Sequence, residues 1–426
     1  MPMNLPEWLT HIENLHPLKW DLGLERVGEV GRRLDVIKPA PLTFLIAGTN
    51  GKGSCCEYLA ALCQTRGLRA GKTTSPHLSI FNERIVIDGD VASDVEIVAA
   101  FESIDDARGD ISLSYFEFSA LAALVVFKRS KVDVAILEIG LGGRLDAMNI
   151  VEPDVSVITQ IAMDHESWLG DSLSKIAVEK AGVMRGGKHC IVADPSPPDS
   201  IYECATEKQS QLMLLGQDFG LAAEQAWYTE SDGEKCRLAL TGNGHLPAAS
   251  AAAALQAFSC AGYEINQEAL TTVIESTRLP GRMQWLQGFK HSLLLDVAHN
   301  PNAASYLQDY LRDYLRDRLA AKKGPGRIHA IVGMYGDKDI ASVFAILDAQ
   351  IDRWYLCEMS DPRAASAEEL RDALSTEAGS RADTYDKVRI GCDSAFAAAK
   401  EDDLVLVFGS FPVVAEVLKI TGNVDY

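Results

Sequence analysis

Hydrophobic and polar positions in the first half of the chain predict helices that alternate with buried strands. Residues 5–15 and 24–37 carry apolar positions at three- and four-residue spacing, which indicates amphipathic helices. Compact runs rich in Val, Ile and Leu then recur, as in strands buried on both faces of a parallel sheet. The predicted strands are LTFLIAG (42–48), VDVAILEIG (132–140) and VSVITQI (155–161), and the helices between and after them are SCCEYLAALCQTRG (54–67), YFEFSALAALVVFK (115–128) and SLSKIAVEKAGVM (172–184).

The alternation weakens over residues 187–275, breaks at TRLPGRMQWLQGF (277–289) and then restarts. We therefore place a domain boundary at residues 285/286, which gives domains of 1–285 and 286–426. Alternating strands and helices predict an α/β fold with a parallel sheet in each domain. The later strands are SLLLDVA (292–298), RIHAIVG (327–333), WYLCEM (354–359) and DLVLVFGS (403–410), and the later helices start at Pro301, Asp339, Ser366 and Phe411.

Composition and charge narrow the class of partners. Apolar residues make up 47% of the 426-residue chain, which is enough for real cores, and the net charge is −20. Such a charge opposes non-specific attraction to nucleic acid or anionic membranes, so an anionic substrate needs a local basic site. Nine cysteines without paired spacing suggest reduced thiols, and we find neither a signal peptide nor a membrane-length apolar run. We expect a cytoplasmic protein that binds small molecules.

A glycine-rich loop joins the first predicted buried strand to the helix that follows it. The segment AGTNGKGS (47–54) contains Gly48, Gly51 and Gly53, which let the backbone approach a ligand closely. Backbone N–H groups at a helix N-terminus bind anions, Lys52 adds a positive charge, and the Ser54 hydroxyl suits a metal. An ordinary glycine turn is the alternative, but the strand–loop–helix context favours phosphate binding.

Three later segments place possible metal ligands at the ends of predicted strands or in the loops after them. Ser75 lies in TTSPHL, Glu138 ends VDVAILE, and His165 follows VSVITQI. Carboxyl ends of parallel strands converge at the ligand crevice, where Glu138 could bridge magnesium and ATP phosphates. The alternatives are an ion pair between Glu138 and Arg144 and a helix-capping role for His165.

Lys180 lies on a predicted helix among apolar neighbours. One interpretation is that its aliphatic stem packs while its ammonium group reaches solvent. The other is that Lys180 is partly buried near the phosphates.

The segment DVAHNP (296–301) is a second strand-to-helix junction. Asn300 is a good N-cap and Pro301 suits the first helical position. A structural turn alone explains these two residues but leaves Asp296 and His299 unexplained.

Taken together, these motifs resemble the folylpolyglutamate synthases, and in particular the bifunctional bacterial dihydrofolate synthase/folylpolyglutamate synthases of the Mur-type ligase superfamily. The resemblance covers nearly the whole chain. Its segments are WDLGLERV (20–27), GTNGKGS (48–54), TSPHL with NERI (74–85), YFEF (115–118), LEIGLGGRLDAMN (137–149), MDHESWLG (163–170), EKAGV (179–183), LPGR (279–282), DVAHNP (296–301) and GSFPVVAEVL (409–418).

The resemblance implies an N-terminal P-loop ATPase-like domain, a smaller Rossmann-like C-terminal domain and a role for each matched position. Lys52, His165 and a carbamylated Lys180 would be catalytic. The magnesium ligands would be Ser75, Glu138 and His165. The ATP-binding residues would be Thr49, Gly51, Lys52, Gly53, Ser54, Ser250, Arg282 and Asp296. The dihydropteroate site would be lined by Asp21, Leu22, Gly23, Ser114, Tyr115, Phe116, Glu117, Leu145, Asp146 and Ala147, and the loop 75–84 would cover the folate.

The implied activity is ATP-dependent addition of glutamate to dihydropteroate and to tetrahydrofolate through an acyl phosphate. The resemblance also implies two Mg²⁺ ions, possible use of K⁺ and a monomeric state. Two positions depart from the family pattern: Ser250 stands where Asn is usual, and Met148 where Thr is usual.

Three alternatives stay open. A monofunctional folylpolyglutamate synthase is the nearest. A peptidoglycan-precursor ligase would carry a further domain before the loop, whereas only 47 residues precede Gly48 here. A P-loop switch or transport ATPase would not need a second α/β domain that carries LPGR and DVAHNP.

Overall fold

The computed structural model describes residues 3–16, 21–222, 225–230, 233–240, 244–320 and 326–422. Trp20 of the WDLGLERV segment lies outside these ranges. The described chain divides into two compact units, Met1–Arg278 and Leu279–Tyr426. Each unit is built around its own sheet, so the predicted two-domain α/β fold is confirmed.

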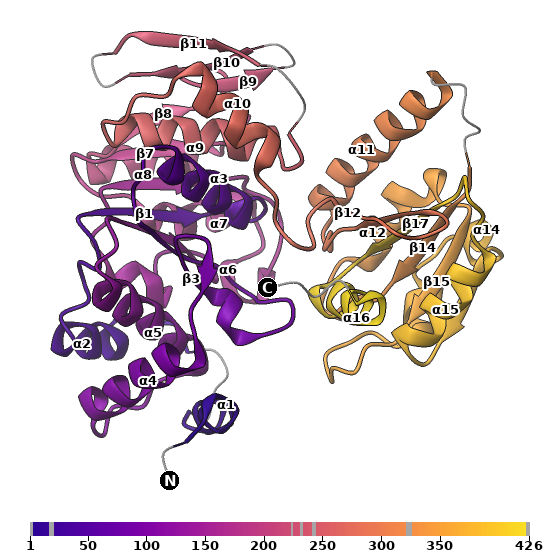
Figure 1. The fold of residues 1–426 in the computed structure, drawn as a ribbon, viewed down its shortest axis with the longest axis horizontal. Helices are drawn as coiled ribbons and strands as arrows, with labels where there is room; N and C mark the ends of the chain where they lie inside the picture. Colours follow the sequence, from indigo (N-terminus) through magenta and orange to yellow (C-terminus); the bar gives the residue numbers. More distant parts are fainter. Residues whose placement is uncertain are drawn as a thin grey trace. The chain divides into compact units, whose positions relative to one another are not determined.

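The sheet of the first unit has eight strands in the order β4-β3-β2-β5-β1-β6-β7-β8 (Figure 1). Its centre is parallel, but β3 and β4 run antiparallel at one edge, where we expected parallel strands only. The strands are β1 (Leu42–Ala47), β2 (Ala70–Thr73), β3 (Ile85–Ile87), β4 (Asp90–Val91), β5 (Val134–Glu138), β6 (Val155–Ile158), β7 (His189–Val192) and β8 (Gln211–Leu214).

Helices cover both faces of this sheet. Adjacent residues of a strand point to opposite faces of the sheet, and two such residues of β2 contact different helices. Gly71 lies against the ring of Phe127 in α5 (Tyr115–Ser130), whereas Lys72 pairs with Glu57 of α3 (Lys52–Thr65). The apolar core on the α5 side includes Phe101 and Phe118. The other helices are α1 (Leu5–Glu13), α2 (Glu25–Arg33), α4 (Asp94–Arg108), α6 (Glu166–Leu169), α7 (Leu173–Lys180), α8 (Asp199–Lys208), α9 (Ala248–Cys260) and α10 (Gln267–Ser276), with 3₁₀ turns η1 (Phe81–Arg84), η2 (Ala147–Ile150) and η3 (Ala181–Val183).

Residues 187–275 do not simply continue the alternation. After β8 they form an antiparallel three-stranded sheet of β9 (Gly220–Ala222), β10 (Gln225–Thr229) and β11 (Lys235–Ala239), which the sequence did not reveal. Strand β11, at one edge of this sheet, alternates exposed and half-buried residues. It therefore lacks the continuous apolar run that is typical of a buried strand.

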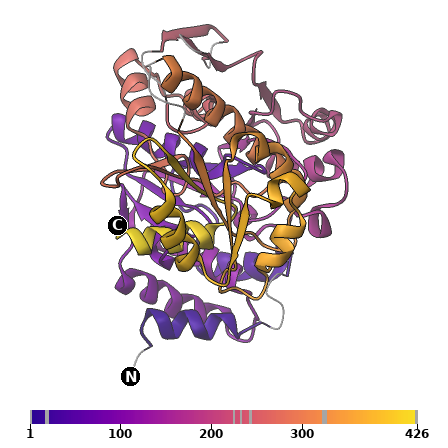
Figure 2. The same cartoon turned by 90° about the vertical axis from the view of Figure 1, so that its right-hand side faces the viewer.

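The second unit has a six-stranded sheet in the order β12-β13-β17-β14-β15-β16, with helices on both sides (Figure 2). β12 (Gln284–Leu286) pairs antiparallel with β13, so this strand belongs to the second sheet although our boundary cut through it. The other strands are β13 (Ser292–Leu295), β14 (Ile328–Val332), β15 (Arg353–Cys357), β16 (Ala382–Tyr385) and β17 (Leu404–Phe408), and the helices are α11 (Pro301–Ala320), α12 (Ile340–Leu347) with η4 (Asp348–Gln350), α13 (Ala367–Asp372), α14 (Thr376–Gly379), α15 (Val388–Ala398) and α16 (Phe411–Thr421).

All nine cysteines are free, and six of them are buried. Among the described residues, no helix combines the length and apolar character that crossing a membrane requires.

Candidate active site

The phosphate loop lies between β1 and α3, and its glycines are required by its geometry. Gly48 has φ +146°, and a Cβ there would lie 1.7 Å from Oγ1 of Thr159. Gly51 has φ +85° and is the N-cap of α3. The Thr159 hydroxyl can donate to the carbonyl oxygens of Ala47 (3.2 Å) and Asn50 (2.8 Å). The end of β6 therefore holds the loop in shape, and only glycine leaves room for this contact.

Polar side chains predicted to bind ATP hold the same loop. The Thr49 hydroxyl exchanges hydrogen bonds with the backbone of Ala162, at 3.1 and 3.0 Å. Ser250, near the start of α9, donates to the carbonyl oxygen of Gly51 at 3.2 Å. Lys52 Nζ donates to the carbonyl oxygens of Gly48 (3.1 Å) and Thr49 (3.3 Å), which places its positive charge over the loop.

Glu138 and Ser75, two of the predicted metal ligands, lie together. Glu138 ends β5 and is buried, and its Oε2 accepts a hydrogen bond from the Ser75 N–H at 3.0 Å. Its Oε1 lies 4.0 Å from Lys52 Nζ. A buried carboxylate beside the phosphate loop has the chemistry that magnesium and ATP phosphates require. The alternative partner Arg144 pairs instead with Glu179.

His165, the third predicted metal ligand, is exposed and stands at the N-cap of α6 with φ +54°. Its backbone N–H donates to Asp164 Oδ1 at 2.8 Å. Within the described ranges, no three His, Cys, Asp or Glu side chains gather in a metal-binding arrangement. The predicted set contains two such side chains and one hydroxyl, so phosphate and water oxygens would have to complete it.

Lys180 is the last residue of α7 and is buried, with an exposed fraction of 2%. The interpretation with an ammonium group in solvent is therefore wrong. Burial, together with the nearby positive charge of Lys52, lowers the pKa of Lys180 to about 7, although the charge of Asp164 opposes the change. A substantial fraction of this amine is therefore neutral at neutral pH, and the neutral amine is the form that reacts with CO₂.

A pocket in the first unit is lined by the predicted dihydropteroate residues other than Tyr115. They come from three parts of the chain: Asp21, Leu22 and Gly23; Ser114, Phe116 and Glu117; and Leu145, Asp146 and Ala147.

The charges in this pocket are held by specific contacts. Glu117 forms a capping box with Ser114 at the start of α5, and Arg26 joins it to Asp21 at 3.1 and 2.6 Å. Burial raises the pKa of Asp146, and hydrogen bonds from backbone N–H groups and the charge of Lys52 offset part of the rise, so that the pKa is about 7. Asp146 Oδ2 also accepts a hydrogen bond from the Leu141 N–H at 2.8 Å, three residues after Glu138, whose Oε1 lies 4.0 Å from Lys52 Nζ. The pocket is thus linked to the phosphate loop through the end of β5.

Tyr115 contacts the loop 75–84 instead of the pocket. Its ring lies beneath the Arg84 guanidinium, 5.8 Å from the ring centroid, and meets the Phe81 ring edge-on. Arg84 Nε donates to His77 Nδ1 at 2.8 Å. The Glu83 carboxylate accepts three backbone N–H groups of the loop, so this segment is folded around it.

In the second unit, Asp296 follows β13 and is held by two backbone donors. Its Oδ1 accepts from Ala298 at 2.8 Å and its Oδ2 from Met283 at 3.0 Å, and burial raises its pKa. The Arg282 guanidinium lies over the Phe411 ring at 4.7 Å. These contacts fix both predicted ATP-binding residues of this unit.

His299 and Asn300 occupy the turn into α11. His299 Nδ1 lies 2.8 Å from the Val297 carbonyl oxygen, and Asn300 caps the helix by accepting from Ala303. Sequence reasoning did not single out Ser410, the N-cap of α16, whose buried hydroxyl has no hydrogen-bond partner among the described residues. The GSFP strand-to-helix turn is the signal that could have pointed to it.

Comparison with known proteins finds relatives that match nearly the whole chain. The family described as Mur ligase, glutamate ligase domain matches residues 281–411. Dihydrofolate synthase/folylpolyglutamate synthase of Escherichia coli is 42% identical over 98% of this chain and 95% of its own length, and that of Haemophilus influenzae is 36% identical over 97% and 96%. The chain belongs to the dihydrofolate synthase/folylpolyglutamate synthase family. Members of this family are ATP-dependent ligases that form C–N bonds.

Solved structures of the family show the same fold. Escherichia coli FolC in complex with DHPP and ADP covers 99% of this chain and 98% of its own, with 40% identity and a TM-score of 0.90. A bifunctional folylpolyglutamate synthase/dihydrofolate synthase with Mn, AMPPNP and L-glutamate bound covers the same shares, with 41% identity and a TM-score of 0.89. Nucleotide and divalent metal binding are thus properties of the family.

Proposed function

We propose that the protein adds L-glutamate to dihydropteroate, giving dihydrofolate, and to the γ-carboxylate of tetrahydrofolate. The observation that supports this most is the pocket, which is linked to the phosphate loop through the end of β5; it is lined by Asp21–Gly23, by Ser114, Phe116 and Glu117, and by Leu145–Ala147. A pterin ring offers amino and N–H donors, which suit the carboxylates of Glu117 and Asp146. A relative solved with DHPP and ADP binds both types of ligand.

The reaction proceeds in two steps, because a carboxylate is a poor acylating agent. A carboxylate oxygen of the pterin substrate attacks the γ-phosphorus of ATP, which gives an acyl phosphate and ADP. The amine of glutamate then attacks the acyl carbon and expels phosphate, while the amine loses a proton. The enzyme positions the reactants and offsets charge, so no nucleophilic side chain is required.

The residues of the phosphate loop bind the nucleotide. Thr49 and Gly51–Ser54 bind the phosphates, Lys52 offsets their negative charge, and Ser250 holds the Gly51 carbonyl. Ser75, Glu138 and His165 hold magnesium, which neutralises phosphate charge when bound. Two magnesium ions, and K⁺ as a further ion, complete this proposal.

Lys180 reacts with CO₂ to form a carbamate. The ammonium form first releases a proton, and the neutral amine then adds to the carbon of CO₂ and loses a second proton, which leaves an anion near Lys52. The carbamate supports the metal site and relieves the cost of an ammonium group beside a second positive charge.

The second unit supplies Arg282 and Asp296 to ATP, while His299 and the orphaned Ser410 hydroxyl are our candidates for binding glutamate. The protein acts as a monomer in the cytoplasm.

Isotope transfer tests the acyl phosphate directly. Dihydropteroate labelled with ¹⁸O in its carboxylate is incubated with ATP, magnesium and glutamate, and the released phosphate is analysed by mass spectrometry. One ¹⁸O atom per phosphate is expected, because the bridging oxygen leaves with phosphorus. Unlabelled phosphate together with dihydrofolate formation would refute the two-step route.

A further inference from the structure

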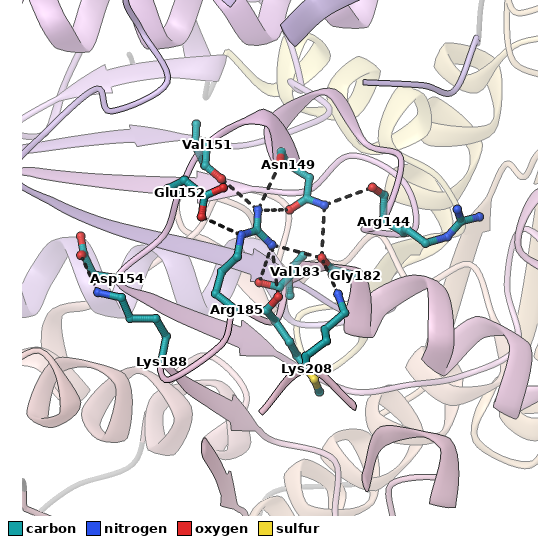
Figure 3. Close-up of polar contacts among 11 residues, drawn as sticks. Arg144, Asn149, Val151, Glu152, Asp154, Gly182, Val183, Arg185, Lys188 and Lys208 are labelled. Carbon is teal, nitrogen blue, oxygen red and sulfur yellow. Dashed lines mark hydrogen bonds and ion pairs between the residues drawn. The ribbon is translucent and has the colours of Figure 1, made fainter. Parts of the chain in front are cut away.

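Arg185, which follows η3, lies between two segments that contribute to the site. Its Nη1 donates to the carbonyl oxygens of Gly182 (3.2 Å), Val183 (3.2 Å) and Met184 (3.3 Å). Its Nη2 donates to the carbonyl oxygens of Asn149 (3.3 Å) and Val151 (2.9 Å). One guanidinium thus caps the C-terminal ends of both η2 and η3 (Figure 3), where carbonyl groups lack helical partners.

The Asn149 side chain makes a second connection between the same segments. Its Oδ1 accepts from Arg185 Nη2 at 2.9 Å, which orients the amide. Its Nδ2 then donates to the carbonyl oxygens of Arg144 (3.1 Å) and Gly182 (3.3 Å). Asn149 is buried, so these bonds have little competition from water.

The two segments are in close contact along their length. A Cβ on Gly182 would lie 2.2 Å from Cα of Arg144, and one on Gly143 would lie 2.7 Å from the carbonyl oxygen of Glu179. The Arg144 N–H donates to the same Glu179 oxygen at 2.8 Å. The backbones can be this close only because both positions are glycine.

Each segment carries part of the chemistry. Leu145, Asp146 and Ala147 line the pocket, and η2 begins at Ala147. Lys180 directly precedes η3. A group that caps the ends of η2 and η3 therefore determines how the pocket wall lies relative to Lys180.

We propose that Arg185 is a positioning residue for the ligase, a role that rests on the proposed function. By holding 144–151 against 180–184, it keeps the pterin-binding wall in register with Lys180. A lysine cannot reproduce this role, because its single ammonium does not present the planar fork that reaches both sets of carbonyls.

Kinetics of Arg185→Met, with Lys188→Met as the matched control, test this role. Lys188 lies in the same region, but the ion pair that it forms within the described ranges is with Asp154, an exposed contact that does not bridge the segments (Figure 3). We expect Arg185→Met to raise KM for dihydropteroate about tenfold or more, because small displacements of positioning groups cost this much. KM for ATP should change less than about twofold, since Thr159 and Ser250 hold the phosphate loop independently. Arg185→Lys should behave like Arg185→Met, since one ammonium cannot span both sets of carbonyls. Free guanidinium ion should partly restore Arg185→Ala and leave the kinetics of Lys188→Ala unchanged.

Hydrogen–deuterium exchange gives a readout that does not require turnover. Exchange should rise in 144–151 and in 181–184 of Arg185→Met and stay unchanged in Lys188→Met. Two results would overturn the positioning role. One is an equal KM for dihydropteroate in Arg185→Met and Lys188→Met, and the other is a fall of every kinetic constant of Arg185→Met in proportion to its folded fraction. If the wild type does not turn over dihydropteroate, the proposed function fails, and the exchange data still decide whether Arg185 holds the two segments together.

Discussion

Replacement of Lys180 by methionine should stabilise the protein, and more so at lower pH. The pKa of Lys180 falls from 10.5 to about 7 on folding, mainly through burial. At about 1.4 kcal/mol per pH unit, this corresponds to roughly 5 kcal/mol of lost stability at pH 7 and below. Methionine keeps the aliphatic volume of the side chain and has no charge to desolvate.

The sign of the pH dependence follows from proton binding. Between pH 7 and 10.5 the unfolded lysine holds a proton that the folded one has released. The wild type therefore recovers stability relative to the variant as pH rises through this window. The expected advantage of Lys180→Met is roughly 5 kcal/mol near pH 6 and roughly 2 kcal/mol near pH 9.

Urea unfolding at these two pH values, in buffers freed of CO₂, measures the difference. Lys175→Met on the same helix is the control, because Lys175 forms an exposed pair with Asp171 and its loss should change stability by less than about 1 kcal/mol. A variant that is no more stable than the wild type at pH 6, or an advantage that does not shrink at pH 9, would refute the account of the buried amine.

The same variant tests the carbamate. Lys180→Met should lose turnover despite its higher stability, and short carboxylic acids should partly restore activity in Lys180→Ala. Wild-type activity should rise when bicarbonate is added to CO₂-free enzyme. Full activity of the methionine variant would exclude the carbamate from the mechanism.

Three further predictions concern the phosphate loop and the metal. Gly48→Ala should raise KM for ATP at least about tenfold or lower the free energy of unfolding by about 3 kcal/mol, because its Cβ would overlap Thr159. Gly67→Ala is the control: Gly67 has φ +64° and open space around it, so this substitution should lower the free energy of unfolding by only about 1 kcal/mol. Nucleotide titration and urea unfolding measure the two effects. Glu138→Gln should keep its fold by circular dichroism and lower kcat at least about a hundredfold, since the amide removes the charge that holds the metal, and a fall below about threefold would remove Glu138 from the metal site. EDTA should abolish ADP release and added Mg²⁺ or Mn²⁺ should restore it; turnover that persists in EDTA would contradict the metal requirement.

The parts of the fold that the sequence predicted are those with strong local signals. The apolar runs of β1, β5, β6, β14 and β17 and the strand–loop–helix pattern at residues 47–54 are of this kind. The short antiparallel edges β3, β4 and β12 were missed because two or three residues carry no periodicity. β16 escaped notice as well, since three of its four residues are only half-buried and two of them are polar.

The site divides in a similar way. The motifs that resemble the family named the nine residues that line the pocket, because each of them lies in a short continuous segment that matches the family pattern. Arg185 was not singled out, since most of its partners are backbone carbonyls and these have no sequence signature. Its role is visible only once the chain brings η2 and η3 together.

The central claim is a glutamate ligase that accepts two pterin substrates. The most direct test is release of ADP in the presence of ATP, magnesium and glutamate, with either dihydropteroate or tetrahydrofolate added. The account predicts glutamate-dependent release with both substrates. Release with tetrahydrofolate alone would leave a monofunctional folylpolyglutamate synthase, and release with neither substrate would contradict the account.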